Sequence, residues 1–115
     1  MDNTTTLQDL KTLVEVFVEK RDWAQFHSPK NLSMALSIEA SELMDLFKWM
    51  TVEEAHEEMK DKLLENASDE LADIMIYAIA FANRYDIDIA KAVREKMEKN
   101  KIKYPADKFK GKFYL

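Results

Sequence analysis

Apolar residues recur along most of the chain at intervals of three and four, the spacing of one face of an α-helix. This pattern predicts four main helices, over residues 4–26, 29–50, 62–85 and 89–103, and a short helix beginning after Thr51. Pro29 favours the start of the second helix, and Thr51 with Glu54 matches a capping-box sequence. Asp88 is placed to cap the last helix, which we expect to end before Pro105.

The fold class expected from this pattern is all-α, a four-helix bundle. One Gly and two Pro among 115 residues are too few for the turns of an all-β protein. A chain of this length favours a single domain over residues 1–115. Residues 104–115 lack a clear period and form a less regular tail, which could pack on a partner subunit through aromatic residues, namely Phe109, Phe113 and Tyr114.

Two acidic pairs interrupt the apolar stripes. Glu39 lies among the stripe residues Leu32, Leu36, Leu43 and Phe47, and Glu42 follows one turn later. Glu70 and Asp73 repeat this arrangement in the third main helix, within the stripe Ala67, Ile74, Ala78 and Phe81. Residues three apart lie on one helix face with Cβ atoms about 5–6 Å apart. Both pairs therefore point towards the predicted core.

Carboxylates on a buried face must be protonated, paired with a base or bound to a metal, because an unpaired buried charge costs several kcal/mol. No Lys or Arg lies on either stripe. A metal is the best remaining answer, although acids at this spacing also form ordinary solvated faces. Oxygen ligands suit Mg²⁺, with Mn²⁺ possible. A di-iron bundle would need two Glu-x-x-His pairs, and the chain has one, Glu53 with His56, in a hydrophilic connection where His56 is expected at the surface.

Composition narrows the classes of partner. A net charge of −5 argues against duplex nucleic acid, which is bound by neutralising phosphates with Lys and Arg. The chain has no cysteine, no visible secretory signal and no apolar run as long as a membrane span, so we expect a cytoplasmic protein without disulfides or membrane contact.

A carboxylate-bound Mg²⁺ typically recruits substrate phosphates, so hydrolysis of a phosphoanhydride is the natural reaction class. With Gly111 as the only glycine, no Walker A loop exists. Trp23 and His27 are four apart and could present a stacking surface beside an imidazole, which would suit a nucleotide base. Tryptophans such as Trp23 and Trp49 are also common in cores and interfaces.

The acidic motifs resemble a known family. Glu39-Ala-Ser-Glu42, followed after 27 residues by Glu70-Leu-Ala-Asp73, resembles the signature of the all-α nucleoside triphosphate pyrophosphohydrolases, the MazG-like group. The segments "RDWAQFHSPKNL", "LFKW", "DELADIMIYAIA" and "KMEKNKIKYP" resemble its dCTP pyrophosphatase branch. The resemblance implies Mg²⁺-dependent cleavage of a nucleoside triphosphate, dCTP or a related pyrimidine nucleotide, to the monophosphate and pyrophosphate. It also implies a homodimer, or a tetramer built from dimers.

Carried over residue by residue, the resemblance implies a complete site. The implied metal ligands are Glu39, Glu42, Glu70 and Asp73, with Glu39 as the residue that helps activate water. The residues implied to contact the base and sugar are Trp23, His27, Trp49 and Tyr77. Those implied to lie near the phosphates are Lys96, Asn100 and Tyr104, although Lys96 could equally be a solvated lysine.

Two positions depart from the family pattern. Ile38 occupies a place where many MazG domains have a further Glu, which bears on whether a second metal binds. Lys30 stands where this branch often has Arg, so a point charge replaces a bidentate donor. Two alternatives remain open at this stage. One is a non-catalytic helical oligomeric interaction module with its acids paired across subunits, and the other is an enzyme of this fold that acts on a diphosphate or a larger nucleotide.

Overall fold

The computed structural model describes residues 1–113, and no strand occurs among them. Its helices are α1 (Leu7–Lys20), the 3₁₀ turn η1 (Ala24–Phe26), α2 (Pro29–Asp45), α3 (Val52–Glu57), α4 (Asp61–Arg84), α5 (Ile89–Lys103) and α6 (Ala106–Phe109). None of the helices in residues 1–113 combines the length and the hydropathy needed to cross a bilayer. The all-α prediction is confirmed.

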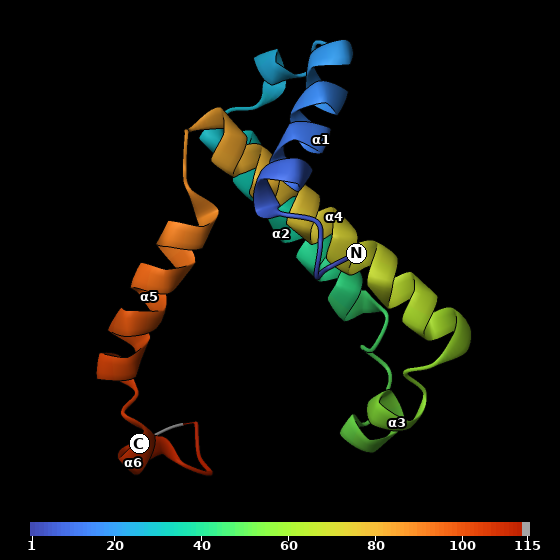
Figure 1. The fold of residues 1–115 in the computed structure, drawn as a ribbon. Coiled ribbons are helices and arrows are strands. Elements are labelled where there is room, and N and C mark those ends of the chain that lie inside the picture. The colour runs from blue at the N-terminus through green and yellow to red at the C-terminus, as the bar shows by residue number, and fades with distance from the viewer. Residues whose placement is uncertain (114–115) are drawn as a thin grey trace.

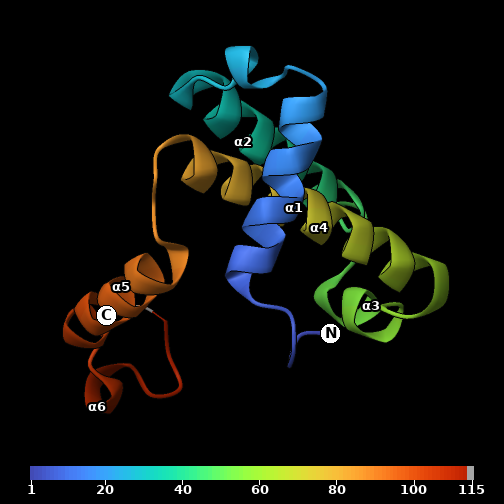
Figure 2. The ribbon, with the colours of Figure 1, turned by 45° about the horizontal axis from the view of Figure 1, so that its top comes forward.

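Helix α4 is the centre of the packed part of the molecule. Helix α2 runs along it, and α1 lies across it (Figures 1 and 2). The buried core cluster joins one residue of α1, one of α2 and two of α4, namely Val14, Leu32, Ile79 and Ala80. Leu32 is 2% exposed, so the start of α2 is held firmly against α4.

The first helix is shorter than the pattern predicted. Thr6 caps α1 in a reciprocal capping box with Asp9, and the helix ends at Lys20 instead of continuing to Phe26. Asp22 then adopts a left-handed backbone conformation with a φ of 52°, which an α-helix cannot contain and which Asp tolerates better than most residues. After this break, the η1 turn returns the backbone to a helical conformation over Ala24–Phe26.

The second helix is also shorter than predicted. It starts at Pro29 with Ser28 as its cap, as the sequence indicated, but ends at Asp45 instead of Met50. Bonds from Leu46 to Leu43 and from Phe47 to Met44 tighten the chain into turns beyond that point. No Gly or Pro marks this end, so the sequence carried no stop signal. The short helix after Thr51 and the bounds of α4 and α5 agree with the prediction to within a residue.

Helix α5 stands away from the packed helices. With α6 it forms what we call the arm, residues 89–113, which projects from the end of α4 in both ribbon views (Figures 1 and 2). No residue of α5 is buried. The radius of gyration is 17.2 Å, whereas a compact chain of this length has about 13 Å. The predicted fourth place in the bundle is therefore empty within one chain, and Tyr114 of the predicted aromatic tail lies outside the described residues.

Candidate metal centre and adjoining pocket

The acidic pairs of α2 and α4 meet where these two helices pack. One carboxylate oxygen from each of Glu39, Glu70 and Asp73 lies within 4.8 Å of the others. All three side chains are partly buried, whereas Glu42 is exposed beside them. The predicted convergence of the two pairs is therefore present, with three carboxylates in the cluster and the fourth at its edge.

The cluster lacks neutralising partners. The Oε2 atoms of Glu39 and Glu70 are buried and have no hydrogen-bond partner. None of the ion pairs formed within residues 1–113 involves these acids. Burial, then a hydrogen bond with Glu42 and the charges of the neighbouring acids, raises the pKa of Glu39 to about 7. The pKa of Glu70 is raised for the same reasons, burial first.

A hard divalent cation fits these residues. Unpartnered carboxylate oxygens on two rigid helices supply a ligand set of oxygen atoms only, which Mg²⁺, Ca²⁺ and Mn²⁺ prefer to softer sets. A bound cation would also remove the repulsion that raises both pKa values. The cluster can therefore bind a metal ion, and its geometry alone does not select one ion of this class.

An apolar pocket of about 530 Å³ adjoins the cluster. It lies between α1, the turn after α1, and α4, and Glu39 and Asp73 form part of its wall. The other lining residues are Leu13, Val14, Phe17, Val18, Trp23, His27, Ile76, Tyr77 and Ala80. The Trp23 and Phe17 rings pack edge to face, with their centres 5.7 Å apart. The Arg21 guanidinium lies 3.6 Å from the centre of the Phe17 ring. One cavity thus joins carboxylates to aromatic rings.

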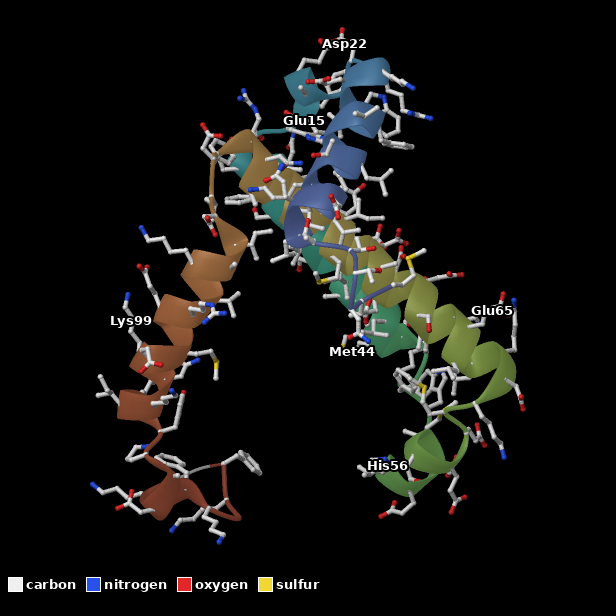
Figure 3. The ribbon with its side chains drawn as sticks, in the orientation of Figure 1. Glu15, Asp22, Met44, His56, Glu65 and Lys99 are labelled. Atoms are coloured by element: carbon white, nitrogen blue, oxygen red, sulfur yellow. The ribbon has the colours of Figure 1, made fainter. Side chains whose placement is uncertain are left out.

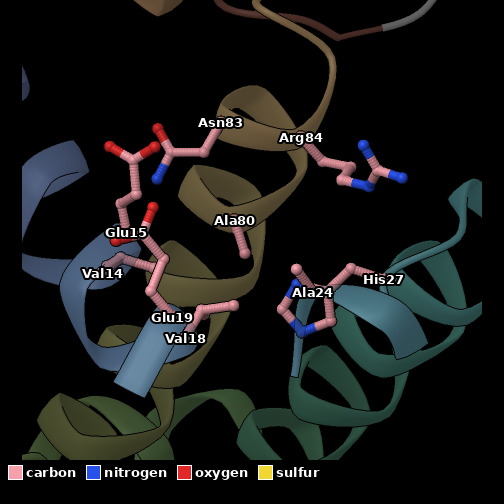
Figure 4. A pocket seen from close by; sticks show the side chains of 9 residues that line it. All are labelled: Val14, Glu15, Val18, Glu19, Ala24, His27, Ala80, Asn83 and Arg84. Atoms are coloured by element: carbon pink, nitrogen blue, oxygen red, sulfur yellow. The ribbon is translucent and has the colours of Figure 1, made fainter. Parts of the chain in front are cut away.

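His27 lines both this pocket and a smaller one beside it. The smaller cavity, of about 200 Å³, is drawn in Figure 4, where His27 and Arg84 face it from one side and Glu15 and Asn83 from the other. Burial, and then the positive charge of Arg84, lowers the pKa of His27. The folded environment therefore favours a neutral imidazole, which can both donate and accept a hydrogen bond.

The local backbone explains how Trp23 and His27 reach the same pocket. Their spacing suggested that they share one α-helix, but they do not. Trp23 precedes the η1 turn, and His27 follows it. Ser28 then caps α2, and Asn31 donates a side-chain hydrogen bond to the Phe26 carbonyl at 3.0 Å. These bonds hold the connection between α1 and α2 in place, so both rings lie against α4 near Tyr77.

Four residues of the predicted site lie elsewhere in the chain. Trp49 follows the far end of α2, 88% exposed. Lys96, Asn100 and Tyr104 belong to the arm, the first two one turn apart on α5 and Tyr104 directly after its end. The arm lies apart from α2 and α4 (Figures 1 and 3). One chain therefore brings together the carboxylates with Trp23, His27 and Tyr77, but not the residues predicted near the phosphates.

The sequence did not single out six of the pocket residues as part of a site, namely Leu13, Val14, Phe17, Val18, Ile76 and Ala80. Among them, Phe17 is 46% exposed. A signal did exist, because Leu13 and Phe17 are four apart and Ile76 follows Asp73 by three, so each shares a helix face with another pocket residue.

Comparisons with known proteins place the chain in one family. A model described as the MazG-like family matches residues 34–112. The chain is 38% identical over 107 residues to dCTP pyrophosphatase 1 of Rattus norvegicus, covering 92% of this chain and 63% of that protein. It is 40% identical over 102 residues to dCTP pyrophosphatase 1 of Homo sapiens, covering 88% of this chain and 60% of that protein. The chain thus spans less than two thirds of the length of these relatives. The crystal structure of a pyrophosphatase from Archaeoglobus fulgidus is similar with a TM-score of 0.80 and 34% identity, covering 85% of this chain and 91% of that one.

Proposed function

The chain belongs to the MazG-like family, and from this premise we propose that it is an Mg²⁺-dependent nucleoside triphosphate pyrophosphohydrolase. Its proposed substrate is dCTP or a related pyrimidine deoxynucleotide, since relatives 38–40% identical to it are named dCTP pyrophosphatases. The observation that carries the proposal is one cavity lined both by aromatic rings and by two carboxylates of the cluster.

The pocket suits the base and sugar of such a substrate. Trp23 and Tyr77 offer ring faces for a base, and stacking of this kind tolerates any base. Discrimination then depends on polar groups, and His27 is the one imidazole in the wall. A neutral His27 can donate to a base carbonyl or accept from an exocyclic amine, so it is a suitable residue for reading a pyrimidine edge.

The cluster suits the phosphates. Its bound cation would supply charge neutralisation for phosphate oxygens and would acidify a bound water. Glu39 and Asp73 both lie in the cluster and in the pocket wall. Because the pKa of Glu39 is raised to about 7, which suits a general base, we propose that Glu39 accepts the proton of the attacking water. Water adds to the α-phosphorus, the α–β phosphoanhydride bond breaks, and pyrophosphate leaves with the bridging oxygen. Glu70 and Asp73 would hold the cation from α4, and Glu42 would complete the set at its exposed edge.

The decisive experiment is a panel of nucleoside triphosphates incubated with the protein and Mg²⁺. We expect monophosphate and pyrophosphate, with ¹⁸O from labelled water in the monophosphate, and the highest kcat/KM for dCTP. Glu39→Gln should abolish turnover, whereas Asp69→Asn, a matched loss of charge at an exposed position on α4, should not. Release of orthophosphate would contradict the proposal. Absence of turnover in a protein that still assembles would favour the non-catalytic oligomeric module.

We also propose that the functional unit is a homo-oligomer, a dimer or a dimer of dimers. The chain exposes 9526 Å² of surface, whereas a folded monomer of 13.5 kDa exposes about 6,500 Å². The excess of about 3,000 Å² is in the range that obligate subunit interfaces bury. The two parts of the chain also differ in the sign of their charge. Residues 1–88 carry 8 basic and 19 acidic side chains, whereas the arm carries 9 basic and 3 acidic side chains. A positive arm is complementary to the negative packed helices of a second copy.

This assembly would complete the site. Lys96, Asn100 and Tyr104 lie on the arm, far from their own carboxylates, so we propose that they bind the phosphates in the pocket of another copy. Trp49, exposed at the end of α2, is proposed to close a neighbouring pocket in the same way. Each site would then contain its metal cluster from one chain and its cationic side chains from another.

Mixing two inactive variants tests the shared site. Glu39→Gln disables the cluster, and Lys96→Ala disables the arm, so a mixed dimer contains one intact site. Activity should reappear when the two variants are mixed and allowed to exchange subunits. A mixture of Glu39→Gln with Glu70→Gln should stay inactive, because both changes affect the same cluster. Failure of the first mixture to regain activity would place all catalytic residues within one chain.

A further inference from the structure

The end of α4 and the connection that leads to the arm are held to α1 by two hydrogen bonds between residues far apart in sequence. Lys11 Nζ donates to the Ile87 carbonyl at 2.9 Å, and Asn83 Nδ2 donates to the Lys11 carbonyl at 2.9 Å. Both bonds are partly buried, and Lys11 takes part in both, once through its side chain and once through its backbone. Asn83 lies on the last turns of α4 (Figure 4).

The connection between α4 and α5 has little freedom of its own. Tyr85 ends α4, and Asp86 adopts a left-handed conformation with a φ of 52°. The Ile87 amide then donates back to the Ala82 carbonyl at 2.9 Å, the bond of a Schellman stop. Asp88 caps α5 through the Lys91 amide at 2.9 Å. Only four residues separate the two helices, so the peptide of Ile87 determines where α5 begins.

The Ile87 amide therefore points back to α4, while its carbonyl points to α1. The amide bond fixes this peptide to α4, and the Lys11 bond fixes it to a second helix that crosses α4. Ile89, the first residue of α5, also packs against the core cluster. These attachments together restrict rotation about the end of α4, and loss of the Lys11 bond would give the arm more freedom to swing. Within residues 1–113 Lys11 forms no ion pair, so its ammonium is directed to this carbonyl.

We propose that Lys11 is a positioning residue, which fixes the direction of the arm so that Lys96, Asn100 and Tyr104 meet the pocket of another copy. Lys11 lines neither the carboxylate cluster nor the pocket, so any effect on turnover would pass through the arm. The effect on substrate rests on the proposed function, whereas the effect on the direction of the arm does not.

The arm's direction can be measured without any assay of activity. The chain has no cysteine, so spin labels can be placed at Lys99→Cys on α5 and Glu65→Cys on α4, both exposed (Figure 3). Dilution with unlabelled chain removes distances between subunits. We expect Lys11→Met, which keeps the apolar stem but loses the donor, to broaden the distance distribution. Lys20→Met, an exposed lysine of the same helix, should leave it unchanged.

Kinetics then tests the consequence for substrate. Loss of one hydrogen bond that orients the phosphate-binding face should raise KM on the order of 3- to 10-fold, with a smaller change in kcat. Lys11→Arg, which retains a donor, should restore most of the affinity. The stabilisation of Lys11→Met by Mg²⁺ should equal that of the unmodified protein, because the cluster lies on α2 and α4.

Two results would overturn the inference. One is a distance distribution for Lys11→Met that superimposes on that of the unmodified protein. The other is an unchanged KM in a variant whose distribution has broadened. If the unmodified protein hydrolyses no nucleotide, the proposed function fails, and the distance measurement still decides whether Lys11 fixes the arm.

Discussion

If the carboxylate cluster binds Mg²⁺ as proposed, one substitution should have opposite effects on thermal stability with and without the ion. Glu70→Gln keeps the shape of the side chain but removes one of the clustered charges. Because burial and the neighbouring acids raise the pKa of Glu70, the metal-free protein disfavours its charged form. The variant should therefore unfold at a higher temperature than the unmodified protein in EDTA.

With Mg²⁺ the order should reverse. An ion that binds only the folded state at a hundred times its dissociation constant stabilises it by about 2.7 kcal/mol. For a chain of about 115 residues this raises Tm by roughly 10–20 °C. Glu70→Gln should lose most of this increase, since the cluster keeps two of its three carboxylates. The assay is a thermal melt followed by circular dichroism across a Mg²⁺ titration.

Asp69→Asn is the matched control for this experiment. Asp69 precedes Glu70 on α4 and is exposed, so its substitution removes the same charge outside the cluster. Its response to Mg²⁺ should equal that of the unmodified protein. The reasoning would be refuted if Mg²⁺ left the Tm of the unmodified protein unchanged, or if Asp69→Asn and Glu70→Gln lost the response equally.

Three further predictions concern titration, the pocket and the core. In EDTA the protein should gain stability as the pH falls from about 7 towards 4.5. The reason is that the pKa of Glu39 is about 7 in the folded protein and about 4.5 in the unfolded chain. Urea titrations should show a smaller gain in Glu39→Gln. Trp23→Ala should cost about 1–3 kcal/mol of nucleotide affinity by loss of stacking, whereas Trp23→Phe should cost less, as KM or calorimetry will report. Leu32→Ala, at a site 2% exposed, should lower the free energy of unfolding by about 2–5 kcal/mol in denaturant, with Leu32→Met much milder.

The sequence predicts those parts of the fold that local chemistry determines. Asp88 and Pro105 bracket α5, and Thr51 caps α3, so these bounds follow from side chains within a few residues. The end of α1 was missed because it depends on the left-handed backbone of Asp22, for which the apolar period gives no signal. The direction of the arm could not be predicted either, because it depends on Lys11, far away in the sequence.

The sequence likewise predicts one part of the candidate site and not another. Acids within apolar stripes predict that Glu39, Glu70 and Asp73 converge, and they do, because α2 packs along α4. Helical periodicity does not tell a residue that lines an open pocket from one in a closed core, so the spacing of Phe17 does not predict its place in the pocket wall. The assignment of Lys96 to the phosphates remains a prediction, since one chain does not contain both halves of the proposed site.

The small number of fully buried side chains has a thermodynamic consequence. With a core of four residues at its centre, a single chain has little apolar burial to offset the conformational entropy lost on folding. In the proposed assembly, folding and association become a single equilibrium of order two or higher. The midpoint of unfolding then rises with protein concentration, and dilution lowers specific activity as the copies separate. The amount of chain present would then set the fraction that is both folded and assembled.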